Sequence, residues 1–183
     1  MVVTATRDMF GDDRPLPDFG SGGCPHRLGQ VIRLHSRTGQ RHLDWLRWGL
    51  APSAAEHPDS APRPTHASAE TVAQLPMFAE AFRQRRAIVP ATEYYQRRTV
   101  GGPGQRSSGE VVRTYCIIAV QATGAVADIH DRMPLVIEEC DWAAWLGEVP
   151  GDPATLLRSS MEDALVVAPV QARRAAAPLA KGR

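Results

Sequence analysis

The sequence predicts a single-domain α+β protein in which a mainly antiparallel sheet carries flanking helices. Segments typical of strands and of helices follow one another without the regular spacing of βαβ units, which argues against a doubly wound parallel sheet. Neither GxGxxG nor GxxxxGK(S/T) occurs, which argues against the phosphate loops of nucleotide-binding folds. A length of 183 residues suits one domain. We expect this domain to span residues 1–170, followed by a flexible basic tail, residues 171–183.

The N-terminal part predicts a long loop and then a β-hairpin. Residues 11–30 are rich in Gly, Pro and Asp and should form a loop. QVIRLH then predicts a strand, SRTGQ a turn, and HLDWLRWGLAP a second strand. Residues 51–65 contain four prolines, so we expect a surface loop there.

The remainder of the chain predicts helices and strands in mixed order. Residues 68–86 have apolar side chains at helical intervals, which predicts a short helix, a break near Pro76 and a second helix ending at Arg86. Three further segments predict strands: AIVPATEYYQRR, TYCIIAVQAT and PLVI. EECDWAAWLGEVP places Trp142, Trp145 and Leu146 on one side of an amphipathic helix.

The composition narrows the classes of partner and compartment. Lys and Arg number 21 against 20 Asp and Glu, so the total charge of +1 provides no bulk attraction to polyanions. Three cysteines without CxxC spacing suggest neither a disulfide framework nor a zinc ribbon. We find no signal-peptide pattern and no apolar stretch of about 18 residues. The expectation is a cytoplasmic protein without a membrane partner.

The segment ADIHDRMPLVI, residues 127–137, concentrates charge around His130 just before an apolar run. Asp128 and Asp131 can orient an imidazole or hold it charged. The alternative is a structural turn in which Asp131 pairs locally with Arg132. His66, His130, Asp128 and Glu93 show no metal-ligand spacing, so we expect neither a metal nor another cofactor.

Five stretches taken in order carry a family resemblance. They are QVIRL, RWGLAP, HASAETV, PMFAEAFRQRRAIVPATEYYQ and IHDRMPLVI. Together they resemble the SOS-response-associated peptidase (SRAP) family, whose members crosslink themselves to abasic sites in single-stranded DNA. The resemblance covers roughly residues 28–146 and implies the open, mainly antiparallel barrel of that family. It further implies a monomer that acts on single-stranded DNA in the DNA damage response.

The resemblance also implies four catalytic positions, of which three are substituted here. The family's cysteine after the initiator Met stands as Val2, so the thiol that traps an imine is missing. The Asn of the Asn-Ala-Arg-x-Glu-Thr motif is His66, and the sequence contains no asparagine. The acid/base Glu of the aromatic motif is Gln96, which hydrogen-bonds but does not shuttle protons. His130, which assists sugar ring opening in the family, is retained.

Residues for DNA contact follow from the same resemblance and from their chemistry. Trp48 offers a stacking face, and arginines can follow a phosphate backbone. The expected contacts are Trp48, Ser68, Arg85, Arg86 and Arg132, with Tyr94, Tyr95, Arg97 and Arg98 as further candidates. Ser68 stands where the family has a phosphate-binding Arg, so it lacks the charge for that contact.

Three functions remain open from the sequence. The first is a degenerate SRAP-like module that binds single-stranded DNA at or near abasic sites, with the crosslinking and peptidase chemistry lost or impaired. The second is an active crosslinker that forms a Schiff base through its N-terminal amine. The third is a decayed copy without function. Cys24, in CPHR, is weighed as a replacement thiol and as an inert packing residue.

Overall fold

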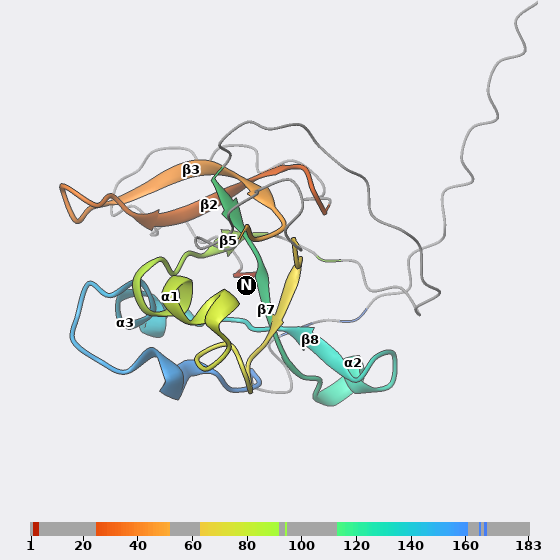
Figure 1. Cartoon of the computed structure of the whole chain (residues 1–183). Helices are drawn as coiled ribbons and strands as arrows, with labels where there is room; N and C mark the ends of the chain where they lie inside the picture. Colours follow the sequence, from red (N-terminus) through yellow and green to blue (C-terminus); the bar gives the residue numbers. More distant parts are fainter. Residues whose placement is uncertain are drawn as a thin grey trace, which may run out of the picture.

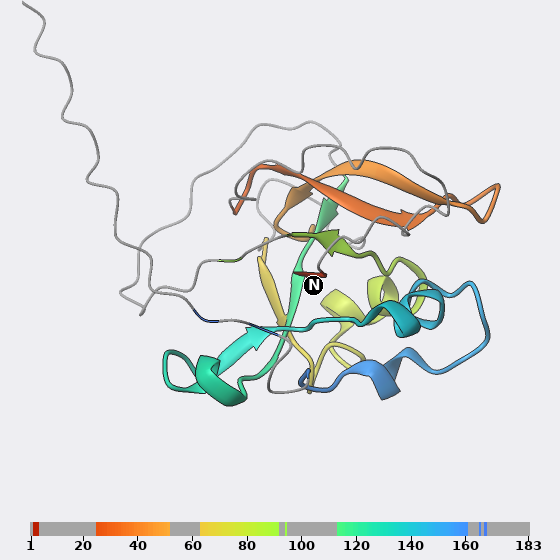
Figure 2. The same cartoon turned by 180° about the vertical axis from the view of Figure 1, so that it is seen from behind.

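A computed structural model of the chain describes residues 2–3, 25–51, 63–91, 94, 113–160, 165 and 167. These residues form three small sheets with short helices around them. The α+β prediction is therefore confirmed. Figures 1 and 2 show the β2–β3 hairpin on one side of the molecule and helices α1 and α3 on the other. The predicted tail and domain boundary lie outside the described residues and stay predictions.

The predicted hairpin is confirmed. Strands β2 (Leu28–Leu34) and β3 (Arg41–Trp48) pair antiparallel, from Leu28↔Arg47 to Leu34↔Arg41. The turn between them places Gly39 at φ +68°, a left-handed conformation that favours glycine. At the far end of β3, strand β6 (Thr114–Tyr115) joins in parallel, pairing Tyr115 with Trp48.

The first described residues of the chain pair with a strand from the middle of the sequence. Strand β1 (Val2–Val3) pairs in parallel with β5 (Val89–Pro90). Ile88, just before β5, exchanges two backbone hydrogen bonds with Ile32 of β2, at 2.7 and 2.8 Å. Both views show β1, in dark red, between the hairpin and the third sheet (Figures 1 and 2).

The third sheet carries three of the predicted site residues, His66, Ser68 and Arg132. Strand β7 (Ile117–Gln121) is its centre, with β4 (His66–Ser68) parallel on one side and β8 (Arg132–Pro134) antiparallel on the other. His66 lies opposite Ile117, and Arg132 lies opposite Gln121. The predicted strand TYCIIAVQAT is therefore real but divided at Cys116, because the chain leaves the sheet of β3 there and enters the sheet of β4.

Helix α1 (Pro76–Gln84) corrects one prediction. Residues 69–75 form turns and not the expected first helix. The amides of Val72 and Leu75 bond back to Ser68 and Thr71, but no regular ladder continues from them. Pro76 begins the helix and does not interrupt one, because a proline lacks the N–H that the first helical position leaves unpaired.

The C-terminal half contains a second correction. Strand β8 ends at Pro134, so PLVI is not a strand, although Leu135 and Ile137 are fully buried. The apolar run reflects burial, and periodicity alone does not separate a buried strand from a buried irregular segment. The helix predicted from EECDWAAWLGEVP is shorter than expected. A 3-10 turn η2 (Glu139–Asp141) leads into α3 (Trp142–Leu146), which Gly147 ends at φ +88°.

Two short elements were not predicted, α2 (Gly124–Ala127) and the 3-10 turn η3 (Pro153–Leu156). The main core lies between α1, α3 and the third sheet. Its buried side chains include Phe78, Phe82, Trp142, Trp145, Leu135 and Ile32. Within the described residues, no helix has the length and apolar character needed to cross a membrane.

Candidate functional site

His66 opens strand β4 and is exposed at the surface. Its ring meets Trp48 edge-on, with 5.6 Å between the ring centroids and 68° between the planes. Its Nδ1 lies 3.0 Å from the hydroxyl of Thr65. The residue at the position of the family's Asn is therefore an aromatic ring that stands against a tryptophan.

Trp48 is fixed by neighbours on both sides. Its indole Nε1 donates to the carbonyl of Thr65 at 2.8 Å, and its ring stacks on Tyr115 with 6.2 Å between centroids. Burial raises the pKa of Tyr115 to about 12, so the phenol is neutral. We call His66, Trp48 and Tyr115 the aromatic group. Its packing means that Trp48 has a structural role whether or not it also stacks on a base.

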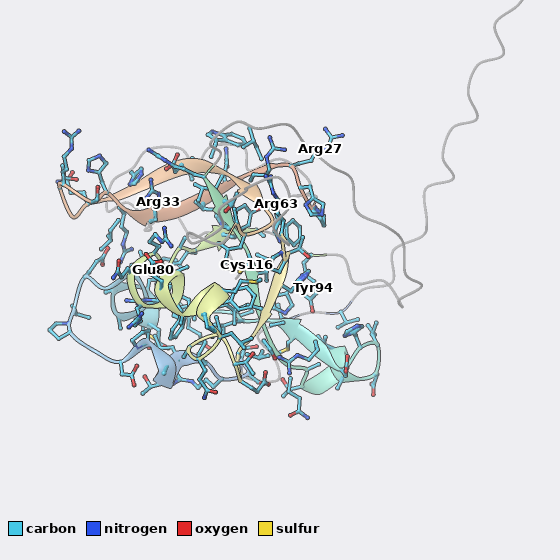
Figure 3. The ribbon with its side chains drawn as sticks, viewed as in Figure 1. Arg27, Arg33, Arg63, Glu80, Tyr94 and Cys116 are labelled. Carbon is cyan, nitrogen blue, oxygen red and sulfur yellow. The ribbon has the colours of Figure 1, made fainter. Side chains whose placement is uncertain are left out.

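The electrostatics of His66 favour its neutral form. Partial desolvation lowers its pKa, and the positive charge of the N-terminal amine lowers it further. The same amine opposes the effect of burial on Cys116, whose pKa is nevertheless raised to about 11. Figure 3 shows Cys116 in the middle of the molecule, where β6 passes into β7. The N-terminal amine thus acts to lower the pKa of both His66 and Cys116, in agreement with the place of β1.

His130 lies in the turn between α2 and β8. Its backbone N–H donates to Val126 at 3.0 Å, and its Nδ1 accepts from the backbone N–H of Arg132 at 2.9 Å. The carboxylate of Asp131 also lies 2.9 Å from Nδ1, although the side chain of Asp131 is 87% exposed. The imidazole is therefore oriented by its own turn.

The guanidinium of Arg132 reaches across the sheet and does not pair with Asp131. Its two terminal nitrogens donate to the two carboxylate oxygens of Glu70, each at 2.8 Å. One of them also donates to the Ser68 hydroxyl at 2.9 Å and to the Ala119 carbonyl at 2.6 Å. We call Ser68, Glu70, Ala119 and Arg132 the Arg132 cluster. The local Asp131–Arg132 ion pair considered from the sequence is thus replaced by a contact between β8, β7 and the end of β4.

Hydrogen bonds from Arg132 and then from Ser68 lower the pKa of Glu70 from 4.5 to about 2. The carboxylate is charged at neutral pH and balances the charge of Arg132. Sequence reasoning named Glu70 only as part of the HASAET segment and gave it no role. One feature of the sequence could have indicated a role for Glu70: this Glu is retained in a motif whose Asn and Arg are both substituted.

His66 of the aromatic group lies on the same sheet as the Arg132 cluster, whereas Trp48 and Tyr115 belong to the neighbouring sheet of β2, β3 and β6. On β7, His66 pairs with Ile117 and Arg132 pairs with Gln121, so the two pairing positions are four residues apart along this strand. At about 3.3 Å per residue this is roughly 13 Å. Ser68 and Ala119 lie between the two positions. The sheet therefore brings Ser68 and Arg132 into contact, with His130 bonded to the backbone of Arg132, while His66 stands against Trp48 of the neighbouring sheet.

Two predicted DNA contacts lie elsewhere. Arg85 follows α1 and pairs with Glu80 at 3.6 Å. Arg86 donates to the carbonyls of Phe82 and Arg83 at 2.8 and 2.7 Å, and also to the carbonyl of Trp145. Burial lowers its pKa. Arg86 thus connects the end of α1 to α3, and its part in DNA binding stays a prediction.

Several predicted residues lie outside the described part of the chain. They are Gln96, Glu93, Tyr95, Arg97, Arg98 and Cys24. Val2 is described only by the pairing of its backbone with Val89. Tyr94 is described, and burial raises its pKa (Figure 3). Among the described residues, no three His, Cys, Asp or Glu side chains come together as metal ligands would.

Three relatives of this chain are each named as an abasic site processing protein. "Abasic site processing protein YobE" of Bacillus subtilis (strain 168) is 28% identical in an alignment of 146 residues, and the match covers 67% of this chain and 67% of YobE. YoqW of Bacillus phage SPbeta, with the same description, is 27% identical over 67% of this chain and 65% of its own. YedK of Escherichia coli (strain K12) is 26% identical over 72% and 67%. The chain spans about two thirds of the length of these relatives.

Solved structures share the fold. The X-ray structure of a protein from Bordetella bronchiseptica aligns with a TM-score of 0.66 at 19% identity, covering 87% of this chain and 92% of that one. A protein from Bacteroides thetaiotaomicron aligns at 0.56 and 20%, covering 72% and 68%. The profile of the family described as "SOS response associated peptidase (SRAP)" matches residues 20–106 and 100–175. Because this profile covers most of the sequence, the chain belongs to the SRAP family.

Proposed function

We propose that this protein binds single-stranded DNA at or near abasic sites in the DNA damage response, with the crosslinking and peptidase chemistry lost or impaired. The observation that carries the proposal is the exposed His66 ring held against Trp48 at the family's Asn position. Aromatic faces bind bases and sugars without sequence preference. The names of the relatives support abasic DNA as the target. We further propose that the protein acts as a cytoplasmic monomer.

The impaired chemistry follows from the substituted side chains. Val2 provides no thiol, so an imine between the N-terminal amine and an abasic aldehyde has no adjacent sulfur to trap it. The neutral imidazole of His66 does not reproduce the carboxamide it replaces, which both donates and accepts through one planar group. We expect DNA binding to remain without this chemistry, because binding depends on stacking against aromatic rings and on positive charge.

A second function is favoured by one specific observation. Strand β1 begins at Val2, directly after the N-terminal residue, and pairs with β5; desolvation and then the charge of the N-terminal amine lower the pKa of His66, which favours the neutral imidazole as a base. Such a base can accept the proton that the ammonium must lose before attack. The amine nitrogen would bond to the aldehyde carbon and water would leave, giving a Schiff base that hydrolyses in reverse. This function differs from binding alone in leaving an adduct that borohydride reduces to a stable amine.

The test measures the affinity of the purified chain for a single-stranded oligonucleotide with and without an abasic analogue, over a series of salt concentrations. We expect tighter binding to the abasic strand, weakening as salt rises. His66→Ala should remove the preference, whereas Arg158→Gln, on an exposed arginine beside Asp141, should not. Equal binding at low and moderate salt, or no binding by a chain that melts cooperatively, contradicts the proposal and favours a decayed copy.

The two functions separate in a trapping experiment with borohydride and an aldehyde-bearing abasic strand. A covalent product that disappears when the N-terminus is blocked identifies the amine as the nucleophile. Binding without any trapped product supports the module that has lost its chemistry. Sedimentation of the free chain tests the monomer.

A further inference from the structure

The ring nitrogen Nδ1 of His130 has two neighbours that require opposite placements of a proton. The backbone nitrogen of Arg132 lies at 2.9 Å with its hydrogen directed at Nδ1. The Asp131 carboxylate oxygen lies at the same distance. The backbone N–H of Arg132 can donate a hydrogen bond only to an unprotonated Nδ1. The carboxylate of Asp131 can accept a hydrogen bond only from a protonated Nδ1. Only one of the two can form at a time.

The geometry of the peptide between Asp131 and Arg132 decides which neighbour prevails. The carbonyl of Asp131 accepts from the backbone N–H of Ala122 at 2.9 Å, where β7 ends. Because a trans peptide is planar, fixing its carbonyl on one side fixes the direction of its N–H on the other. The Arg132 amide is therefore aimed at His130 by the sheet.

The competing carboxylate is held much less firmly. The side chain of Asp131 is almost fully exposed, and exposed ion pairs are weakened by water and by lost side-chain entropy. A backbone N–H always carries its hydrogen, and leaving it unpaired against the ring is costly. The amide bond thus outweighs the contact with Asp131.

We propose that the backbone amide of Arg132 holds His130 in the neutral tautomer protonated at Nε2, so that the ring presents a hydrogen-bond donor, and not an acceptor, to an oxygen of the bound ligand. Within the described part of the chain, no residue bonds to Nε2, and the side chain of His130 is 24% exposed. The tautomer is a property of the free protein. The identity of the ligand, an abasic sugar or a phosphate oxygen, rests on the proposed DNA-binding function.

The first test is nitrogen-15 NMR of the imidazoles in the free, full-length chain at slightly alkaline pH. The chain has six histidines, and His130→Gln assigns the signals of interest. We expect the bare-nitrogen signal at Nδ1 and the protonated signal at Nε2. A proton on Nδ1 would overturn the proposal.

Two variants separate the backbone amide from the side chains near it. Asp131→Asn removes the competing carboxylate, and Arg132→Gln removes the guanidinium but keeps the amide. Both should leave the tautomer unchanged. A change of tautomer in Asp131→Asn would show that the carboxylate, and not the amide, sets the ring, which overturns the proposal even if both variants are stable.

The second test uses affinity for the abasic oligonucleotide. His130→Gln places an amide NH2 near the position of Nε2–H and should retain most of the binding. His130→Leu has no donor and should bind about tenfold more weakly, the loss of roughly one hydrogen bond. Equal affinities of the Gln and Leu variants would overturn the donor role. If the wild type binds no DNA while NMR shows Nε2–H, the proposed function fails and the tautomer stands.

Discussion

Arg132 and Glu70 form a two-pronged ion pair, with both nitrogen–oxygen distances at 2.8 Å, that connects β8 to the turn after β4. The planar guanidinium matches the carboxylate, which makes this geometry stronger and more directional than a single contact. The same nitrogens are those that a DNA phosphate would need. In the proposed DNA-bound state, Glu70 would therefore compete with a phosphate for Arg132.

This competition predicts that Glu70→Gln strengthens binding to single-stranded DNA. Without the carboxylate, the positive charge of Arg132 is no longer balanced. One additional phosphate contact should steepen the dependence of log affinity on log salt by about one. The measurement is a titration at several salt concentrations, with Glu138→Gln, on an exposed carboxylate at the start of η2, as the control. Weaker binding by Glu70→Gln would show that the pair positions Arg132 for DNA.

The lowered pKa of Glu70 predicts a specific acid dependence of stability. The folded state holds the pKa at about 2, against 4.5 ordinarily, so the unfolded state binds the proton more readily. The contribution is complete above pH 4.5 and is lost as the pH falls towards 2. Because Glu70 is 55% exposed, we expect at most about 1 kcal/mol. Denaturant melts at a series of pH values should show a shallower decline in Glu70→Gln than in Glu138→Gln.

Two tryptophans provide a matched test of the core. Trp145 is 1% exposed, meets Phe82 edge-on at 6.1 Å and donates to the carbonyl of Ala87. Trp45, in β3, is 56% exposed. Trp145→Ala should lower the free energy of unfolding by about 3–5 kcal/mol, through lost burial and the cavity left behind. Trp45→Ala should change it by less than about 1 kcal/mol. Similar losses in the two variants would contradict the assigned core.

Gly29 tests the packing beneath the aromatic group. A β-carbon on Gly29 would lie 2.3 Å from the hydroxyl oxygen of Tyr115, so the phenol must move. Gly29→Ala should therefore destabilise the protein by about 1–3 kcal/mol. Adding Tyr115→Phe removes the clashing oxygen and should recover part of the loss. Gly151→Ala, where no atom lies within 4 Å, is the control. Additive effects of the two changes would argue against this contact.

The substituted family positions predict how crosslinking could be regained. Val2→Cys supplies the thiol but neither the carboxamide nor the proton carrier, so we expect little heat-stable adduct with an abasic strand. Val2→Cys combined with His66→Asn and Gln96→Glu should give measurable adduct on a denaturing gel. If Val2→Cys alone reached the level of the triple variant, positions 66 and 96 would matter less than we infer.

Local sequence signals predicted the local parts of the structure. The hairpin followed from two strand-like runs around a short turn with Gly39, and the helix at Trp142 from an amphipathic pattern that ends at Gly147. The predictions were wrong for two segments whose apolar side chains pack against the core although the backbone is neither helix nor strand. PLVI is buried by the core, and the segment before Pro76 is held by turns.

The sequence by itself determined the class of the fold and the family, because these depend on residue types and their order; that Val2, His66 and Gln96 replace the family's thiol, amide and carboxylate stays a prediction from the same resemblance. Only the tertiary structure decided that Arg132 pairs with Glu70 and not with Asp131, and that His66 stands against Trp48. These contacts join strands that are far apart in the sequence, and parallel pairs such as β4 with β7 leave no mark in local periodicity. Their partners are selected by how the sheets pack around one core, which is a property of the whole chain.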